Sequence, residues 1–361
     1  MKRAINFNAG PAAIPQEVLE KARDEMLDWK GTGMSVMEVS HRSKEYEEMH
    51  NHAQASFKEI AGMGDDWKIL FLMGGANLQF SMLPMNFVPD GGKAEYIVTG
   101  HWAKAALKEA KRYGGVPSVS TEKDGAFRSI PKQSEIKVDP KAAYVHMTSN
   151  NTIFGTQWRY WPDVGTVPLI ADMSSDIFSR PFPADKFSFI YAGAQKNLGP
   201  SGVLVAAVKE SFLAKAKEDL PSMLSYKVHA ANNSLFNTPP CFSIYILDLT
   251  LDWIKKMGGL KGLEKINDEK ARVLYDAIDA SGGFYNDPVD KDARSKMNVV
   301  FRLPSEELEE KFVKEAKAAG IIGVKGHRSV GGIRFSIYNA NLVENVKKSV
   351  DFMKDFQKRN G

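Results

Sequence analysis

The chain has 361 residues, of which 43% are hydrophobic and 25% charged, a balance typical of globular proteins with room for two domains. A formal net charge of +4, from 48 basic and 44 acidic residues, gives no reason to expect a nucleic-acid or membrane partner. Cys241 is the only cysteine, which excludes an intrachain disulfide and fits a reducing compartment.

The N-terminal segment does not resemble a signal peptide. The basic run Met1-Lys2-Arg3 leads into a stretch interrupted by Asn6, Asn8, Gly10 and Pro11 rather than into an apolar run. No part of the sequence approaches the ~20 apolar residues of a membrane-spanning helix. We therefore expect a cytoplasmic protein.

Short apolar runs alternate with amphipathic segments through the first two thirds of the chain. Residues 1–15 predict an extended arm, and Gln16 to Trp29 and Ser43 to Ile60 predict helices. Nearly continuous apolar runs predict strands buried on both faces: Lys68 to Leu72, Glu95 to Thr99, Ala143 to Met147, Val167 to Asp172, Phe187 to Ala192 and Gly202 to Val208. Trp102 to Arg112 predicts one of the intervening helices. This alternation predicts an open α/β sheet, which binds ligands beyond the carboxyl ends of its strands.

The last third has longer amphipathic segments and fewer apolar runs, a pattern that predicts a smaller α/β domain. Its expected helices are Ser243 to Lys256, Leu260 to Ala280, Ser305 to Ala319 and Leu342 to Gln357, and its expected strands are Met297 to Leu303 and Ile333 to Tyr338. We predict a boundary near Gly258-Gly259, with a large domain over 16–258. The small domain then comprises 259–361 together with the arm, 1–15.

Two chemically active side chains follow successive predicted strands. Asp172 ends one strand, and Lys196 lies in Ala192-Gly193-Ala194-Gln195-Lys196-Asn197 after the next, so a right-handed crossover would bring both to one edge of the sheet. Pyridoxal phosphate needs this pair, because an amine forms the Schiff base and a carboxylate keeps the pyridine nitrogen protonated. Alone, Asp172 could equally be a helix cap, and Lys196 a solvated loop lysine.

Other strand ends could complete such a site. Phe71-Leu72-Met73-Gly74-Gly75-Ala76-Asn77-Leu78 predicts a strand, a glycine turn and a helix start, where backbone N–H groups bind phosphate. Trp102 follows another strand end and could stack on the pyridine ring or belong to the core. The polar run Thr148-Ser149-Asn150-Asn151-Thr152 could hydrogen-bond the ring hydroxyl.

These motifs together resemble the phosphoserine aminotransferase family. The segments that carry the likeness span almost the whole chain: Asn6-Phe7-Asn8-Ala9-Gly10-Pro11-Ala12, Glu38-Val39-Ser40-His41-Arg42, Gly74-Gly75-Ala76-Asn77-Leu78-Gln79-Phe80, Gly193-Ala194-Gln195-Lys196-Asn197, Phe236-Asn237-Thr238-Pro239-Pro240 and Gly326-His327-Arg328.

The resemblance implies a fold-type I pyridoxal-phosphate enzyme, with a seven-stranded, mostly parallel sheet, that works as a homodimer with shared active sites. It implies amino transfer from L-glutamate to 3-phosphohydroxypyruvate, giving O-phospho-L-serine and 2-oxoglutarate in serine biosynthesis. Bacterial members often also act on 4-phosphohydroxy-L-threonine in pyridoxine biosynthesis.

The resemblance also implies roles for individual residues. Lys196 is the Schiff-base lysine, and Asp172 the partner of the pyridinium nitrogen. The other cofactor contacts implied are Trp102 stacking on the ring, Thr152 at the ring hydroxyl, Ala76, Asn77 and Gln195 at the phosphate, and Asn237 and Thr238 from the neighbouring subunit. Some members have an arginine in place of Asn77, so we assign Asn77 to the cofactor only.

The substrates carry two anionic groups each, which arginine binds well because its planar fork is bidentate. The dipeptide His-Arg occurs at His41-Arg42 and at His327-Arg328, as phosphate-binding candidates or as plain surface charge. Arg334 lies in a predicted apolar strand, where a charge is costly unless paired. It is the candidate clamp for the α-carboxylate, the alternative being a structural ion pair. His50 and His52 face apart on a helix, so we expect no metal site.

Other functions fit the sequence less well. A cysteine desulfurase needs a catalytic cysteine, whereas Cys241 precedes an apolar helical run. An alanine–glyoxylate aminotransferase or a non-catalytic pyridoxal-phosphate carrier needs no cation cluster for a doubly anionic substrate. A nicotinamide dehydrogenase is disfavoured because its glycine fingerprint is missing.

Overall fold

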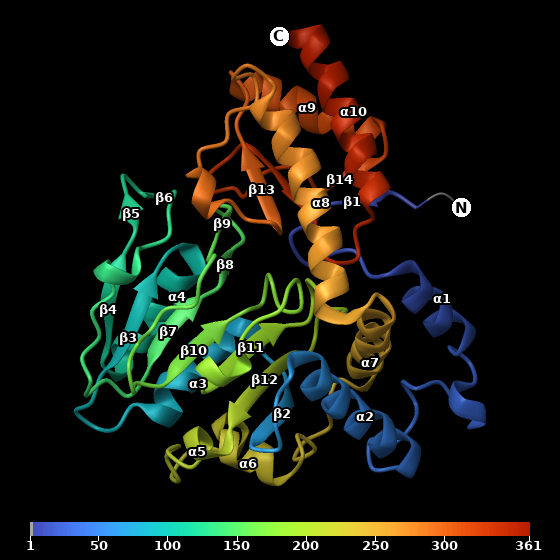
Figure 1. Cartoon of the computed structure of the whole chain (residues 1–361). Helices are drawn as coiled ribbons and strands as arrows, with labels where there is room; N and C mark the ends of the chain where they lie inside the picture. The colour runs from blue at the N-terminus through green and yellow to red at the C-terminus, as the bar shows by residue number, and fades with distance from the viewer. Residues whose placement is uncertain (1–2) are drawn as a thin grey trace.

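The computed structural model describes residues 3–361, so the first two residues of the predicted arm lie outside it. Figure 1 shows a central sheet with helices on both faces, and a C-terminal part, coloured orange to red, stacked above it. Within the described residues no helix is both long and apolar enough to cross a membrane.

The central sheet has seven strands, in the order β2 (Trp67–Leu72), β12 (Leu204–Lys209), β11 (Phe189–Gly193), β10 (Leu169–Asp172), β7 (Val145–Thr148), β3 (Ala94–Val98) and β4 (Gly115–Ser120). Strand β12 is antiparallel to both neighbours, and the other pairs are parallel. The six predicted strands are confirmed as members of this sheet. Strand β4, at the edge, was not predicted.

Helices cover the two faces of the sheet with separate apolar cores. One face carries α3 (Gly75–Phe87), α4 (His101–Ala110), α5 (Glu210–Leu213) and α6 (Tyr226–Ala231). The other carries α1 (Gln16–Asp24), α2 (Lys44–Ala61) and α7 (Cys241–Lys256). Helix α2 begins where the Ser43 hydroxyl accepts from the Tyr46 amide, which caps a free backbone donor. Helix α1 ends well before the predicted Trp29, which is buried in a short 3₁₀ turn instead.

A third core lies in the C-terminal part. Its elements are α8 (Gly259–Asp279), β13 (Asn298–Phe301), α9 (Glu306–Ala318), β14 (Ile321–Ile322), β15 (Ile333–Ser336) and α10 (Val343–Asn360). Strand β15 pairs with β13, and the arm strand β1 (Ile5–Asn6) pairs with β14. The arm therefore packs against the C-terminal part. We propose that the small domain comprises this arm and residues 259–361, because Phe7 shares their core.

Buried polar contacts join the two parts beside Lys196. The Asn339 amide donates to Asn197 Oδ1 over 3.0 Å, and Asn267 Nδ2 donates to Asn339 Oδ1 over 2.9 Å. Lys270 Nζ on α8 donates to the Ile337 and Tyr338 carbonyls, directly after β15. These bonds fix β15 relative to α8 and to the Lys196 loop.

Candidate active site

A cavity of about 350 Å³ opens beyond the carboxyl ends of the parallel strands, where α/β sheets bind their ligands. The strand ends, the helix starts that follow them and the arm all contribute. The lining residues that carry chemistry are Ala76, Asn77, Trp102, Thr148, Asn150, Thr152, Asp172, Ser174, Ser175, Gln195, Lys196, His327 and Arg334, with Ala9 and Gly10 from the arm. Most of the residues predicted to bind cofactor or substrate thus meet in one place.

Lys196 is the amine at the centre of this cavity. Its Nζ donates to Thr152 Oγ1 over 2.9 Å. Burial lowers the pKa of Lys196 to about 8, despite the opposing effect of Asp172. The arm passes so close that a Cβ on Gly10 would come within 3.4 Å of Lys196 Cγ, and Gly10 has a φ of +134°. A lowered pKa leaves more of the amine neutral and nucleophilic near pH 7.

Asp172 is the buried carboxylate of the cavity. It ends β10, directly beside β11, which leads to Lys196. Its Oδ1 accepts a hydrogen bond of 2.9 Å from the Ser174 amide. Burial raises the pKa of Asp172, while the hydrogen bonds and Lys196 oppose the rise. The side chain is therefore placed to pair with a cationic ring nitrogen in a low-dielectric site.

The start of α3 supplies backbone donors for a phosphate. Gly74 has a φ of +83°, and no side chain caps the helix. A Cβ on Gly74 would lie only 2.5 Å from Leu78, so glycine is required there. Ala76 and Asn77 in the first turn line the cavity, with Gln195 opposite. Uncapped N–H groups at a helix N-terminus bind anions.

Arg334 lies at the junction of the sheet and the small domain. Its Nη1 donates to the Thr152 carbonyl over 3.4 Å, and its buried Nε has no partner among residues 3–361. Burial lowers the pKa of Arg334, and no carboxylate in the described part of the chain counteracts this. Arg334 thus forms no structural ion pair with the part of the chain that the structure describes. The buried Nε1 of Trp102, which also lines the cavity, likewise has no partner within the described residues.

His327 lines the same cavity, whereas Arg328 is exposed beside it. Burial, together with Arg334, His101 and Arg328, lowers the pKa of His327. The His327 ring lies 6.0 Å from the ring of His101, at the start of α4. We did not predict His101, although it precedes Trp102 at a strand end. The contributions of Ala9, Gly10, Ser174 and Ser175 were also missed.

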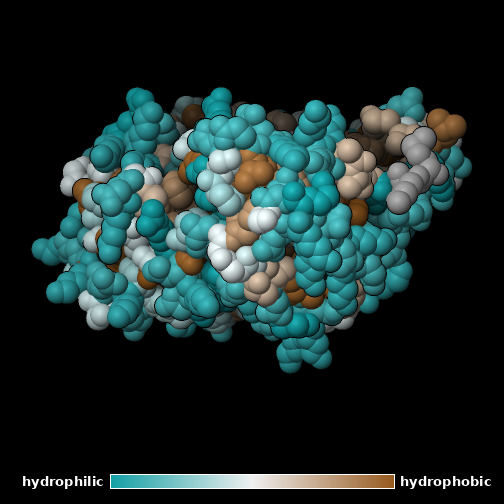
Figure 2. Space-filling view, turned by 90° about the horizontal axis from the view of Figure 1, so that it is seen from above, coloured by the Kyte–Doolittle hydropathy of each residue, from teal (hydrophilic) through white to brown (hydrophobic). Residues whose placement is uncertain are grey.

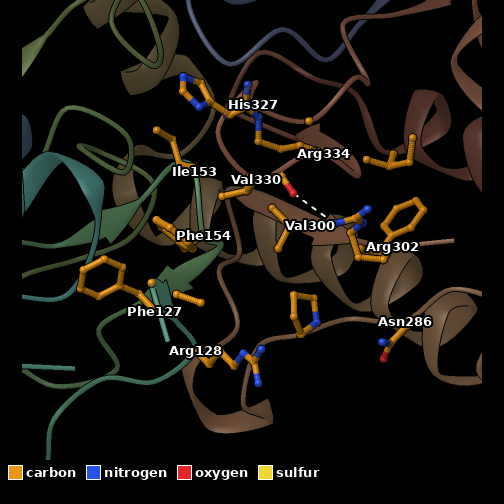
Figure 3. Close-up of a pocket in the computed structure, with 17 residues that line it drawn as sticks. Phe127, Arg128, Ile153, Phe154, Asn286, Val300, Arg302, His327, Val330 and Arg334 are labelled. Carbon is orange, nitrogen blue, oxygen red and sulfur yellow. Dashed lines mark hydrogen bonds between the residues drawn. The ribbon is translucent and has the colours of Figure 1, made fainter. Parts of the chain in front are cut away.

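A second cavity, of about 380 Å³, adjoins the first, and its lining residues are drawn in Figure 3. The two share Ile153, His327 and Arg334. Figure 3 shows apolar side chains from both parts of the chain around it, with Arg128 and Arg302 at its margins. Arg302 is paired with Glu309, whose other oxygen accepts from the Gly332 amide over 3.0 Å. Glu309 thereby ties α9 to the loop that carries His327.

Five predicted site residues do not line the cavity of their own chain, namely Arg328, which is exposed beside it, and four residues farther away. His41 and Arg42 precede α2, and the half-buried Asn237 and the exposed Thr238 precede α7. Asn237 instead borders a small separate hollow with Met73, Met223 and Pro239. One chain therefore does not bring these residues to Lys196. His50 and His52, which we did not assign to a site, contact different groups, namely the Asn233 carbonyl and the Asp248 carboxyl.

The cavity fits pyridoxal phosphate by the chemistry of its donors. It holds an amine whose lowered pKa favours the neutral form that reacts with an aldehyde. It also holds a buried carboxylate for a ring nitrogen and an uncapped helix start for a phosphate. The indole of Trp102 offers an aromatic wall. A site of this composition is typical of enzymes that transfer amino groups.

Comparison with known proteins agrees with this chemistry. Residues 4–348 match the aminotransferase class-V family, and the chain belongs to that family. The phosphoserine aminotransferase of Desulfosudis oleivorans is 54% identical over 100% of this chain and 99% of its own. The relative of that name from Lysinibacillus sphaericus is 52% identical over 99% of each chain. The resemblance noted from the sequence is thus confirmed.

Solved structures show the same fold. The phosphoserine aminotransferase from Bacillus circulans subsp. alkalophilus matches with a TM-score of 0.98 at 52% identity, over 100% of both chains. A pyridoxal-phosphate-bound phosphoserine aminotransferase from Trichomonas vaginalis matches with a TM-score of 0.92 at 37% identity, over 98% of this chain and 100% of that one. The predicted fold-type I architecture is confirmed.

Proposed function

We propose that this chain transfers the amino group of L-glutamate to 3-phosphohydroxypyruvate, giving O-phospho-L-serine and 2-oxoglutarate, with pyridoxal phosphate held at Lys196. The observation that carries the proposal is that the amine of Lys196 and the half-buried guanidinium of Arg334, which has no ion-pair partner among the described residues, both contact Thr152. The relatives at 52–54% identity that bear the name phosphoserine aminotransferase support the choice of substrates.

Each residue has a defined task in this proposal. When bound, pyridoxal phosphate supplies an electron sink for the bonds at the substrate α carbon. Lys196 Nζ removes the proton from that carbon, and Asp172 keeps a positive charge on the ring nitrogen favourable. Arg334 binds the α-carboxylate that both substrates share. Because its Nε has no partner among residues 3–361, a carboxylate that binds there displaces no ion pair within that part of the chain.

The distal anion is assigned to the two His-Arg pairs. His327 and Arg328 come from the same chain as Lys196, on the loop before β15. His41 and Arg42 of the partner subunit would complete the pocket, as Asn237 and Thr238 of the partner subunit would complete the phosphate site. Exposed apolar side chains next to both segments support a homodimer: Met34 and Met37 near Arg42, and Phe236 beside Asn237.

The face seen in Figure 2 is mostly hydrophilic, with hydrophobic residues scattered over it. The exposed apolar side chains near Arg42 and Asn237 support an interface between subunits at these segments, since neither segment lines the cavity of its own chain. As part of the proposal we place the enzyme in the cytoplasm, where its single cysteine, Cys241, stays reduced.

The direct test is an amination assay with glutamate as donor. We expect kcat/KM for 3-phosphohydroxypyruvate to exceed that for hydroxypyruvate by roughly a hundredfold or more, since the phosphate adds several charge-assisted hydrogen bonds. Equal values would overturn the substrate assignment. Replacing glutamate by 4-phosphohydroxy-L-threonine in the same assay tests the second reaction expected from the resemblance.

A further inference from the structure

Beneath the cavity, a chain of buried polar side chains runs from Asp172 into the sheet. Tyr191 is the register partner of Asp172 on β11, and hydrogen bonding by its side chain is one of the influences that oppose the rise in the pKa of Asp172. The Tyr191 hydroxyl lies 2.9 Å from His146 Nε2 on β7. Because side chains two residues apart on a strand share a face, and His146 is the register partner of Ile170, all three point to the same side of the sheet.

The direction of the protons along this chain follows from burial. Burial lowers the pKa of His146 to about 3, so the imidazole is neutral and carries one N–H. An ionised carboxylate can only accept, so the Tyr191 hydroxyl donates to Asp172. Its oxygen then accepts from His146 Nε2–H. The other ring nitrogen, Nδ1, carries no proton in this arrangement. It is buried and has no hydrogen-bond partner among residues 3–361.

Two other ionisable groups interact with Asp172, namely Lys196, which lowers its pKa, and the buried carboxyl of Asp176. The ring of Tyr96 stacks on His146 with centroids 4.8 Å apart, and the Tyr96 and Tyr144 hydroxyls lie 2.6 Å apart. Tyr226, on α6, donates to Gln79. Burial raises the pKa of Tyr191 well above its usual value, so this hydroxyl keeps its proton. His146 and Tyr191 thus keep their protons, so that the His146 N–H is directed at Tyr191 and the Tyr191 O–H at Asp172.

We propose that Tyr191 and His146 are positioning residues that keep the Asp172 carboxylate ionised and aimed at the ring nitrogen of the cofactor. This inference rests on the proposed role of Asp172. Hydrogen bonds to the charged form of a carboxylate favour that form. Without them the proton shared between ring nitrogen and carboxylate moves to the carboxylate oxygen, and the ring becomes a weaker electron sink.

The chain offers a matched pair of variants. Tyr191→Phe removes the hydroxyl that interacts with Asp172 and His146, whereas Tyr144→Phe removes a buried hydroxyl of the same apolar core whose partner among the described residues is Tyr96. Each variant removes one buried hydroxyl from the same core, so a general effect of such a loss on the fold should appear in both. His146→Gln keeps an N–H donor near the position of Nε2, and His146→Leu removes it.

The test is the nitrogen-15 chemical shift of ring-labelled pyridoxal phosphate bound to each protein, which distinguishes a protonated from an unprotonated ring nitrogen. We expect wild type, Tyr144→Phe and His146→Gln to show the protonated shift at pH 8. Tyr191→Phe should move toward the unprotonated shift, with His146→Leu between them. We also expect Tyr191→Phe to lower kcat roughly tenfold with little change in the KM for glutamate.

Identical shifts in Tyr191→Phe and Tyr144→Phe would overturn the inference. If Tyr191→Phe does not fold, His146→Leu showing the same shift as His146→Gln overturns it equally. Asp172→Asn distinguishes a failure of the proposed role of Asp172 from a failure of the inference about Tyr191 and His146. An unchanged shift in Asp172→Asn contradicts the role of Asp172 itself. A changed shift there, with none in Tyr191→Phe, contradicts only the inference.

Discussion

Lys196 Nζ donates to the hydroxyl of Thr152 over 2.9 Å, and the carbonyl of the same threonine accepts from Arg334 at 3.4 Å. Thr152 therefore connects the lysine proposed to carry the cofactor with the guanidinium proposed to bind the substrate. The two cations meet across one residue although they come from different parts of the fold, since Lys196 follows β11 and Arg334 lies on β15.

Thr152→Val should reduce catalysis without unfolding the protein, because it keeps the branched shape and removes the hydroxyl that Lys196 contacts. A hydrogen bond to a charged group contributes about 1.5–3 kcal/mol, so we expect kcat/KM for glutamate to fall roughly tenfold or more. Thr152→Ser, which keeps the hydroxyl, is the control. A valine variant as active as the serine variant would show that the hydroxyl has no role.

Cofactor capture by the apoenzyme should depend on pH in a way set by Lys196. Burial lowers its pKa to about 8, and only the neutral amine attacks an aldehyde. About a tenth of the amine is neutral at pH 7, so the rate of pyridoxal phosphate binding should rise through pH 8 and level off above about pH 9. Stopped-flow absorbance measures this, with Nα-acetyllysine correcting for titration of the cofactor. A corrected rate that still rises tenfold per pH unit near pH 10 would mean an unperturbed lysine.

Arg334 and Arg328 should fail in different ways when replaced by alanine. Arg334 is half-buried and lines the same cavity as Lys196, and we assign it to the α-carboxylate that every substrate carries. Arg334→Ala should therefore weaken the binding of glutamate and of both keto acids together. Arg328→Ala should weaken the binding of 3-phosphohydroxypyruvate roughly ten- to a hundredfold and change the binding of hydroxypyruvate little. The ratio of kcat/KM for the two keto acids separates these results, and an unchanged ratio in Arg328→Ala would remove that residue from the phosphate pocket.

Shared active sites predict that two inactive variants can rescue each other. Lys196→Ala inactivates the site of its own chain, and Arg42→Ala inactivates the site of the partner. In a mixed dimer one site then retains both residues. Refolding or co-expressing the two variants should restore up to the activity of one site per hybrid dimer, which is about half that of a wild-type dimer. If hybrids form, as shown by affinity tags on each chain, and no activity returns, Arg42 acts on its own chain or not at all.

The sheet was largely predictable because its inner strands are continuous apolar runs bounded by glycine and polar residues. Edge strand β4 was missed, since Pro117 and Ser118 interrupt any apolar pattern and half-exposed edges do not need one. The antiparallel direction of β12 was also not read. The run from Gly193 to Gly202 contains no helix, and so short a connection could have indicated it.

The site was predictable where chemistry follows directly after a strand, as at Asp172 and Lys196. His101 shows what this approach missed, because its position next to His327, which is remote in sequence, follows only from the fold. The register that aligns Tyr191 with Asp172 is likewise a property of strand pairing. The partner-directed residues Asn237 and Thr238 were named from the resemblance alone, and nothing local in their sequence predicts a phosphate contact.

The most direct test of the account is to identify the lysine that carries the cofactor. Within the described part of the chain, burial lowers the pKa of two lysines, Lys196 to about 8 and Lys270 to about 7. Lys270 donates to two backbone carbonyls outside the cavity, so of these two it is Lys196 that can reach the aldehyde. Borohydride reduction of the holoenzyme, followed by peptide mapping, should place the phosphopyridoxyl group on Lys196. A label on Lys270 or on any other lysine would contradict the account.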